Sequence, residues 1–280
     1  MSAVVNYLRG PWCIAVYTWR EGIRKKTLVG FLILSLLVIF GSSFMAVFLD
    51  PTTIGDVQSD IDLKLVKDIC VSTISIFGVL ITIFISASVV LNEAESKVIY
   101  TVLSKPVRRF QYLLGKFVGV QMIILVNLLL MAGLFFLALY FRQAILPTLL
   151  LWSPLLTYFE FLVISAFTFA LSCTATSAVL PTIGGFFIYL TGNLTEYLKD
   201  VYIRSGQTEE WLDALIGRVA YGLYYILPNL QRFSLKTQII NSLPNDPPRD
   251  AMIPNVVALG VLYAISGFLL AYWVFRNREV

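Results

Sequence analysis

Histidine is absent from this 280-residue sequence, and charged residues make up only 14% of it. Without an imidazole, the chain cannot hold zinc, copper or haem through histidine or use histidine as an acid/base catalyst. A water-soluble domain carries about 25% charged residues, whereas 58% of the residues here are hydrophobic. These shortages exclude a soluble enzyme and a disordered chain, and they predict a multi-span membrane protein.

Cysteine is also scarce, because Cys13, Cys70 and Cys173 lie far apart and form no Cys-x-x-Cys pair. The spacing indicates neither a disulfide framework nor a thiolate metal site, so we expect packing roles for all three and no bound metal. The first apolar run starts late and follows an arginine and lysine cluster, unlike a cleavable signal peptide. We expect this first span to direct the chain to the membrane.

Apolar runs of roughly 20 residues, long enough to cross a bilayer, recur along the chain. The six runs are 27–49, 69–91, 117–141, 150–173, 178–197 and 255–275. The predicted fold class is an all-α membrane protein with six transmembrane helices in a single transmembrane domain, 1–280. Pro181, Gly184 and Gly185 near the start of the fifth run permit either a kink or close helix packing.

Lysine and arginine collect on one side of the membrane if both termini share that side. Such residues are retained in the cytoplasm, so we expect both termini there and a multi-pass protein of the plasma (inner) membrane. Because this rule explains the excess of basic residues, the net charge of +4 does not require nucleic acid as a partner.

A helical face of apolar residues precedes the first span, within 11–26, and Pro11 suits the first turn of such a helix. The face comprises Trp12, Val16, Trp19 and Ile23. Side chains suited to the lipid headgroup layer are Trp12, Trp19, Arg24, Lys25 and Lys26. We predict an amphipathic elbow helix along the inner surface; the alternative is a simple extension of the first span.

The loop 92–116, between the second and third runs, changes from acidic to basic. Ile99, Val102 and Leu103 share one helical face, and Pro106 cannot continue that helix. We expect a short helix that projects into the cytosol and fits a partner's groove. The alternative is a solvated, positive-inside connection.

This loop carries a family resemblance. Acidic residues, then Leu-Ser-Lys-Pro (103–106), Arg-Arg (108–109) and Leu-Leu-Gly-Lys (113–116), resemble the permease subunits of type-2 ATP-binding-cassette (ABC) transporters. Leu-Pro-Asn-Leu-Gln-Arg-Phe (227–233) is similar to the copper-enzyme-maturation type, which leaves the cargo open. The resemblance implies that 92–116 is a coupling helix docked on a separate ATPase subunit. Its signature positions are Glu93, Glu95, Leu103, Pro106, Arg109, Gly115 and Lys116.

A Walker phosphate loop is absent, because Gly115-Lys116 is followed by Phe117 and residue 110 is phenylalanine rather than glycine. The chain is therefore predicted not to be an enzyme and to need no cofactor of its own. ATP and magnesium would be held by the partner ATPase.

The segment 198–254 is too long for a simple turn. Apolar residues at helical spacing from Trp211 to Ile226, with Thr208 as N-cap and Pro228 at the end, predict an outer helix. By resemblance it would close the transport path from outside; a helix lying passively on the membrane surface is the alternative.

Glu160 is the one acid well inside a predicted span. A charge at that depth costs about 3 kcal/mol, so we expect Glu160 to face protein, water or a cavity. It either lines the translocation path or fixes helix packing through hydrogen bonds, and Asn127 is a partner for it under both interpretations.

Two functions compete. The preferred one is an ABC permease, an exporter, that works with an ABC ATPase subunit, membrane lipids and a second permease as a homodimer or heterodimer. The alternative is an ATP-independent carrier with Glu160 as its proton site, or a structural membrane-assembly subunit. The apolar spans suit a lipid-like cargo, but every bilayer protein shares that composition, so the substrate stays open.

Overall fold

The computed structural model describes residues 2–48, 56–91, 108–140, 148–195, 228–233 and 253–277, with 197, 203, 217–219, 221–222 and 224 between them. The helices are α1 (Ser2–Ile23), α2 (Lys26–Phe48), α3 (Asp56–Ser88), α6 (Arg109–Tyr140), α7 (Thr148–Thr174), α8 (Val179–Asn193), the 3-10 helix η1 (Leu230–Phe233) and α12 (Ile253–Asn277). The described residues form helices and turns without a strand, which confirms the all-α prediction.

Among the residues that the structure describes, four helices are long and apolar enough to cross a bilayer. These spans are Val66–Ser88, Arg109–Tyr140, Trp152–Thr174 and Pro254–Asn277. In α2, which has 23 residues, the side chains that the structure describes include the apolar stretch Leu28–Ser42. The 15 residues of α8 extend about 22 Å, less than the roughly 30 Å core of a bilayer. The chain is thus a multi-pass membrane protein, and the count of six spans stays a prediction.

Several helices begin earlier than the apolar runs indicated. The helix α3 starts at Asp56 and α6 at Arg109, whereas the runs started at 69 and 117. Polar residues such as Gln111 and Lys116 are good helix formers, so α6 begins before the apolar run does.

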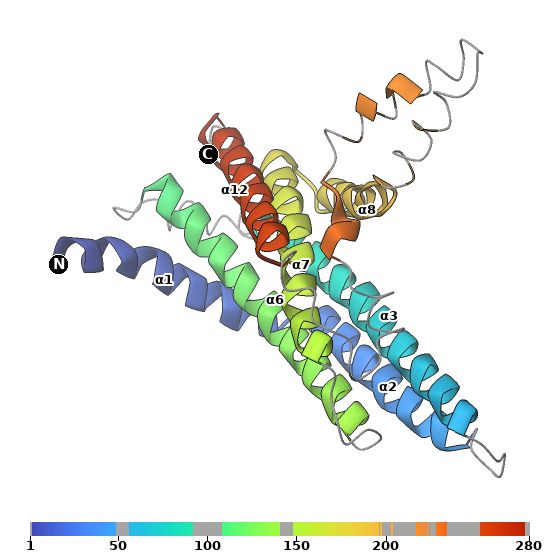
Figure 1. Ribbon diagram of the computed structural model, residues 1–280. Helices are drawn as coiled ribbons and strands as arrows, with labels where there is room; N and C mark the ends of the chain where they lie inside the picture. Colours follow the sequence, from blue (N-terminus) through green and yellow to red (C-terminus); the bar gives the residue numbers. More distant parts are fainter. Residues whose placement is uncertain are drawn as a thin grey trace.

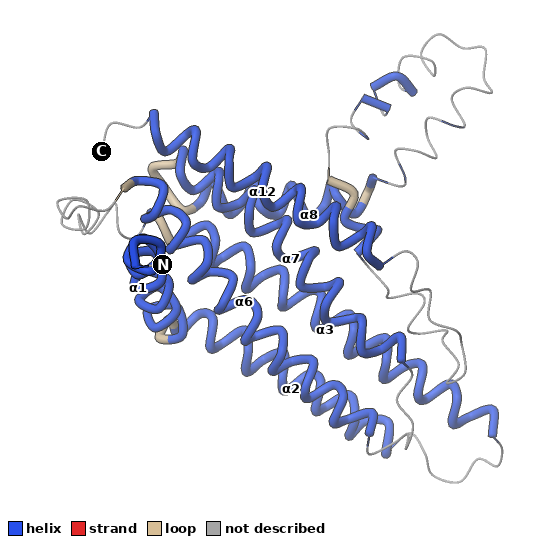
Figure 2. Tube along the Cα trace, turned by 60° about the vertical axis from the view of Figure 1, so that its left-hand side comes forward, coloured by secondary structure: helices blue, strands red, loops and turns tan. Residues whose placement is uncertain are grey.

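The long helices form a bundle in which α7 packs between α12 and α3 (Figure 1). In Figure 2 the helix α1 is viewed almost along its axis while α2, α3 and α6 extend across the page, so α1 runs across the bundle. Glycines let the helices approach closely: a Cβ at Gly267 of α12 would lie 2.9 Å from the Cβ of Ala166 in α7. Such small-residue contacts are typical of membrane helices.

The helix α8 continues through Pro181, Gly184 and Gly185. Pro181 stands in its first turn, where its missing N–H leaves no helical hydrogen bond unmade. Gly185 lies against Thr168 of α7 and Ile83 of α3. Close packing, rather than a kink, is what these residues provide here.

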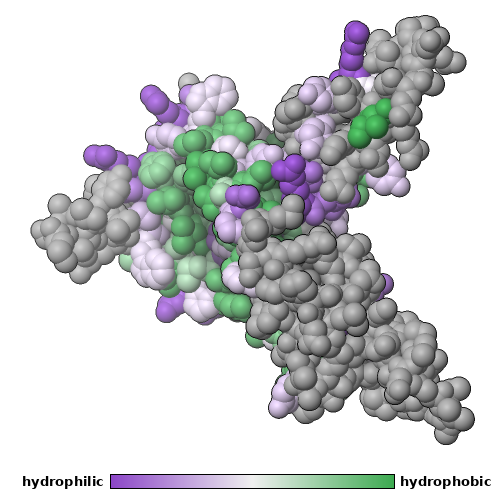
Figure 3. All heavy atoms as spheres, viewed as in Figure 1, coloured by the Kyte–Doolittle hydropathy of each residue, from purple (hydrophilic) through white to green (hydrophobic). Residues whose placement is uncertain are grey.

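The outer faces of the bundle are strongly apolar. Leu262 and Trp273 of α12 are 68% and 64% exposed, and Ile183 of α8 is 64% exposed. Figure 3 shows an apolar band on the viewed face, with hydrophilic residues toward the helix ends. This distribution fits a surface solvated by lipid.

The prediction that Pro11 begins the first helix is wrong, because α1 starts at Ser2 and encloses Pro11. An interior proline costs a helix about 3 kcal/mol or more. Pro11 is buried, and its carbonyl lies against Gly115 of α6. Packing on α6 offsets the missing hydrogen bond.

Candidate functional site

Exposed basic residues gather at one end of the bundle, where α1 meets α2, α6 begins and α12 ends. They are Arg24, Lys26, Arg108, Arg109 and Arg276, and we call this the basic end. Residues 92–107 connect α3 to α6 here. Of the predicted coupling residues, Glu93, Glu95, Leu103 and Pro106 lie outside the described residues, so the structure positions only Arg109, Gly115 and Lys116.

The attachment points of 92–107 are firmly packed. Leu91 is fully buried on the α3 side, and Tyr112 and Leu113 are fully buried on the α6 side. The Tyr112 ring stacks on Phe275 of α12 with centroids 5.9 Å apart. Close packing transmits displacement with little loss, so both helices are positioned to follow a movement of this segment.

Arg109 joins the start of α6 to the end of α12. Its Nη1 donates a hydrogen bond to the carbonyl oxygen of Arg276, 3.2 Å away. A cation at the last carbonyls of a helix is favoured by the helix dipole. The guanidinium remains exposed at the basic end.

Gly115 and Gly119 form a Gly-x-x-x-Gly seam where α6 meets α1. A Cβ at Gly115 would lie 2.6 Å from the Pro11 carbonyl oxygen, and one at Gly119 would lie 2.8 Å from the Ala15 carbonyl oxygen. These positions tolerate only glycine unless the two backbones separate. The α1 face in this contact consists of Pro11, Ala15, Thr18 and Gly22.

Lys116 lies between the two glycines and is 1% exposed. Its Nζ is 5.5 Å from the centroid of the Tyr17 ring of α1, in cation–π geometry. The side chain is therefore directed toward α1 in this structure. Its role in docking an ATPase stays a prediction.

The turn between α1 and α2 is tied to α3. The Lys25 Nζ donates a hydrogen bond to Ser88 Oγ, 3.0 Å away. Ser88 is the last residue of α3, and the described turn that follows it ends three residues later, at Leu91. A movement of 92–107 would therefore reach the α1–α2 turn as well as α6.

The predicted membrane-interface residues divide into two environments. Trp12 is 59% exposed, whereas Trp19 packs against the core. Arg24 and Lys26 are exposed. The face that carries Trp12 and Ile23 is thus left open rather than buried on α6, and its contact with lipid headgroups stays a prediction.

Glu160 is 6% exposed on α7, close enough to Tyr189 of α8 for electrostatic interaction. Asn127 donates instead to the Ile123 carbonyl of its own helix, 2.8 Å away. Within the described residues no hydrogen bond joins Asn127 to Glu160, so the structure does not bring this predicted pair together.

Sequence reasoning missed a buried polar contact between α6 and α7. Gln121 Nε2 donates to Ser165 Oγ at 2.6 Å, while the buried Gln121 Oε1 has no partner within the described residues. The hydroxyls of Thr82 and Ser86 on α3 are likewise buried and unpaired there. The available signal was the position of Gln121 inside a long apolar run, because polar residues within membrane helices face other helices.

At the opposite end of the bundle, residues 228–233 of the Leu-Pro-Asn-Leu-Gln-Arg-Phe motif pack against α7, α8 and α12. Leu230 and Phe233 are fully buried, Leu230 against Gly192 of α8 and Phe233 against Gly260 of α12. Gln231 Nε2 donates to the Asn193 carbonyl oxygen, 2.5 Å away. These contacts join η1 to α7, α8 and α12 at this end of the bundle.

The family model described as ABC-2 family transporter protein matches residues 12–280, nearly the whole chain. The chain belongs to this family. No curated protein matches the sequence. Members of the ABC-2 family are membrane components that normally work with an ABC ATPase and are generally not catalytic themselves, so this chain is a transporter permease. The resemblance to type-2 ABC permease subunits is confirmed, and the similarity to the copper-enzyme-maturation type stays a prediction.

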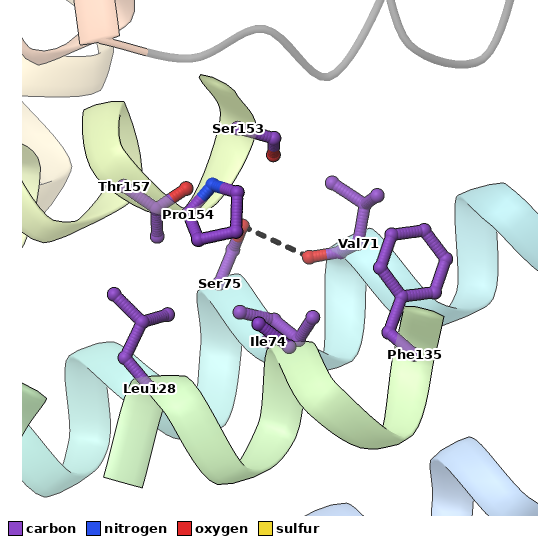
Figure 4. Close-up of a pocket in the computed structure, with 9 residues that line it drawn as sticks. Val71, Ile74, Ser75, Leu128, Phe135, Ser153, Pro154 and Thr157 are labelled. Atoms are coloured by element: carbon purple, nitrogen blue, oxygen red, sulfur yellow. Dashed lines mark hydrogen bonds between the residues drawn. The ribbon is translucent and has the colours of Figure 1, made fainter. Parts of the chain in front are cut away.

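The ABC-2 permease has a small cavity between α3, α6 and α7, lined by Ile74, Leu128, Phe135 and Pro154 among others (Figure 4). Ser75 in its wall donates to the Val71 carbonyl of its own helix, 3.0 Å away. The cavity measures about 20 Å³, whereas one water needs about 10–15 Å³. It holds water at most and is too small for cargo.

Proposed function

We propose that this ABC-2 permease is the membrane half of an exporter driven through 92–107 by a separate ABC ATPase. The observation that carries the proposal is the packing of both attachment points, at Leu91 on α3 and at Tyr112 and Leu113 on α6. Because the residues on both sides of 92–107 are packed in this way, a force that the ATPase exerts on this segment would move both α3 and α6.

ATP-driven closure of the ATPase would displace 92–107 and with it the ends of α3 and α6. The Gly115–Gly119 seam joins α1 to α6, and the Lys25–Ser88 hydrogen bond joins the α1–α2 turn to α3. These helices would move as one body against α7 and α12. Such rigid-body movement is a common way to switch between two states.

The cargo path would lie between two permease chains, either two copies of this chain or this chain and a similar one. The interior cavity of about 20 Å³ supports that location, since it leaves no room for cargo among α3, α6 and α7. In this proposal Leu230 and Phe233, which are buried at the end opposite the basic end, would act as a gate that opens only during release.

The experiment is co-purification of the permease with its ATPase from membranes. Leu103→Asp should release the ATPase, because a charge on the apolar ridge opposes docking in an apolar groove. Arg24→Asp, a charge reversal at the basic end outside the loop, should retain it. Membrane insertion of both variants is verified by fractionation, and retention of the ATPase by an inserted Leu103→Asp variant would contradict the proposal.

An ATP-independent carrier remains the second candidate, and burial of Glu160 is the observation in its favour. Within the described helices its carboxylate accepts no hydrogen bond that would explain the burial as packing. The two functions differ in one requirement. A proton-coupled carrier needs the carboxyl group of Glu160 for transport, whereas an ATP-driven permease does not.

A further inference from the structure

A second, larger hollow opens on the side of the bundle between α6, α7 and α12. It has a volume of about 440 Å³ and is lined entirely by apolar side chains. They include Phe110, Leu114 and Phe117 of α6, Leu162 of α7, and Ile265 and Phe268 of α12. We call it the lateral groove.

Aromatic rings hold the walls of the lateral groove apart. Phe268 packs against Phe110 and Phe117 with centroids 5.7 and 5.5 Å away, so α12 meets α6 through rings. By contrast, α12 meets α7 through Gly267 and Ala166. The groove is therefore a consequence of the aromatic rings between α6 and α12. Figure 3 shows the apolar surface on this side of the molecule.

The groove leads to the basic end. Phe110 in its wall adjoins Arg109, whose Nη1 binds the Arg276 carbonyl oxygen. Arg108, Arg109 and Arg276 are all exposed there. An apolar channel thus ends beside three guanidinium groups, which bind phosphate well because they present paired N–H donors.

We propose that the lateral groove binds one anionic phospholipid, with an acyl chain along α12 and the headgroup phosphate at Arg108, Arg109 and Arg276. From Val261 in the groove wall to Arg276, the helix rises about 22 Å, enough to cover one leaflet, about half of a 30 Å bilayer core. Basic pockets between membrane helices are known to select anionic headgroups. The lipid would fill the lateral groove between α6 and α12 and complete the packing there, while it remains exchangeable with other lipid molecules.

Native mass spectrometry of the delipidated permease, without the ATPase, tests this proposal. The probes are phosphatidylglycerol and phosphatidylcholine with identical palmitoyl and oleoyl chains. The wild-type protein should retain one phosphatidylglycerol several-fold better than phosphatidylcholine. The Arg109→Gln/Arg276→Gln variant should lose this preference, whereas Arg218→Gln/Arg232→Gln, which removes two exposed charges outside the basic end, should keep it.

A matched pair on α12 tests the apolar part of the site. Ile265, 50% exposed in the groove wall, becomes tryptophan to fill the groove, and Leu262, 68% exposed one turn earlier and not among the groove residues, becomes tryptophan as the control. Ile265→Trp should lose the retained lipid and Leu262→Trp should keep it. Size-exclusion chromatography verifies folding, and Leu269→Trp replaces Ile265→Trp if that variant aggregates.

Three results would overturn the proposal. Equal retention of the two lipids would show that the arginines do not select the headgroup. Equal behaviour of Ile265→Trp and Leu262→Trp would show that the groove is not the site. Loss of a permease dimer in Ile265→Trp with unchanged lipid retention would show that a second chain occupies the groove.

Discussion

The helix α6 meets its two neighbours at the basic end in opposite ways. Toward α1, Gly115 and Gly119 bring the two backbones into contact on two successive turns of α6. Toward α12, Phe110 and Phe117 keep the helices apart and leave the lateral groove of about 440 Å³. One side of the helix is a fixed joint. The other is a junction of rings and one hydrogen bond beside an open groove, where Tyr112 stacks on Phe275 and Arg109 binds the Arg276 carbonyl oxygen.

This contrast indicates which parts of the permease move together. A contact of glycines with the backbone of a neighbouring helix has one arrangement, because any separation opens a void along the seam. Rings across an open groove can slide or tilt while they stay in contact. We therefore expect α1 and α6 to move as one body and α12 to change its position relative to α6.

The largest effect is expected from adding a methyl group to the seam between α1 and α6, the fixed joint. Gly119→Ala places a methyl group 2.8 Å from the Ala15 carbonyl oxygen, which a backbone cannot avoid by a rotamer change, so stability should fall by about 1–3 kcal/mol. Gly133→Ala, on the same helix with no atom within 4 Å of the new methyl, should be neutral or stabilising. Thermal unfolding in nanodiscs measures both; equal melting temperatures would show that the seam is not tight.

A second, somewhat smaller effect concerns the face of α6 that meets α7. Ser165→Ala removes the acceptor of the Gln121 amide and leaves a buried donor unpaired, a loss of about 1–2 kcal/mol. Adding Gln121→Leu should recover most of that loss, because both polar partners are then gone. Additive losses in this double-mutant cycle would mean that the two side chains do not interact.

A smaller effect is expected at Tyr17. Tyr17→Leu removes the ring beneath the buried Lys116 ammonium and should lower stability by about 0.5–2 kcal/mol. Tyr17→Phe keeps the ring and should resemble the wild-type protein. The comparison is made by chemical denaturation of the two variants in the same detergent, and a matching loss in both would point to the hydroxyl rather than to the ring.

The smallest effect is expected for Glu160→Gln in ATP-driven transport. If the energy comes from the ATPase, a neutral amide of the same size should leave transport nearly unchanged in vesicles supplied with ATP. Abolished transport, with normal ATPase binding, would instead favour the carrier function and would remove the need for a moving α1–α6 body.

The apolar runs predicted where the membrane helices lie to within a turn at most ends, because lipid imposes both their composition and their length. The contact between α1 and α6 was not predicted. The pattern of Trp12, Val16, Trp19 and Ile23 drew attention to one side of α1, whereas the small residues Ala15 and Gly22, on the neighbouring side of the helix, make the contact. Small-residue stripes carry a weak periodic signal, and the partner of such a stripe depends on the tertiary arrangement.

Polar residues within the helices were partly predictable. The sequence singled out Glu160 by its charge, and burial followed as expected. Its partners depend on helix rotation, which no run of apolar residues encodes, so the proximity of Tyr189 was found only in the structure. Gln121 was overlooked because an uncharged amide changes the hydropathy of its run very little.

The most direct measurement of the central claim is a pair of spin-label distances in the permease–ATPase complex, without nucleotide and with ATP trapped. Labels at the exposed Cys13 of α1 and at Leu129→Cys of α6 report the fixed joint; labels at Leu129→Cys and Leu262→Cys, with Cys13→Ser, report the junction with α12. Dilution with unlabelled permease limits the signal to pairs within one chain. We predict that the first distance stays constant while the second changes on ATP trapping; a shift of the first as large as the second, or no shift in either, would contradict the account.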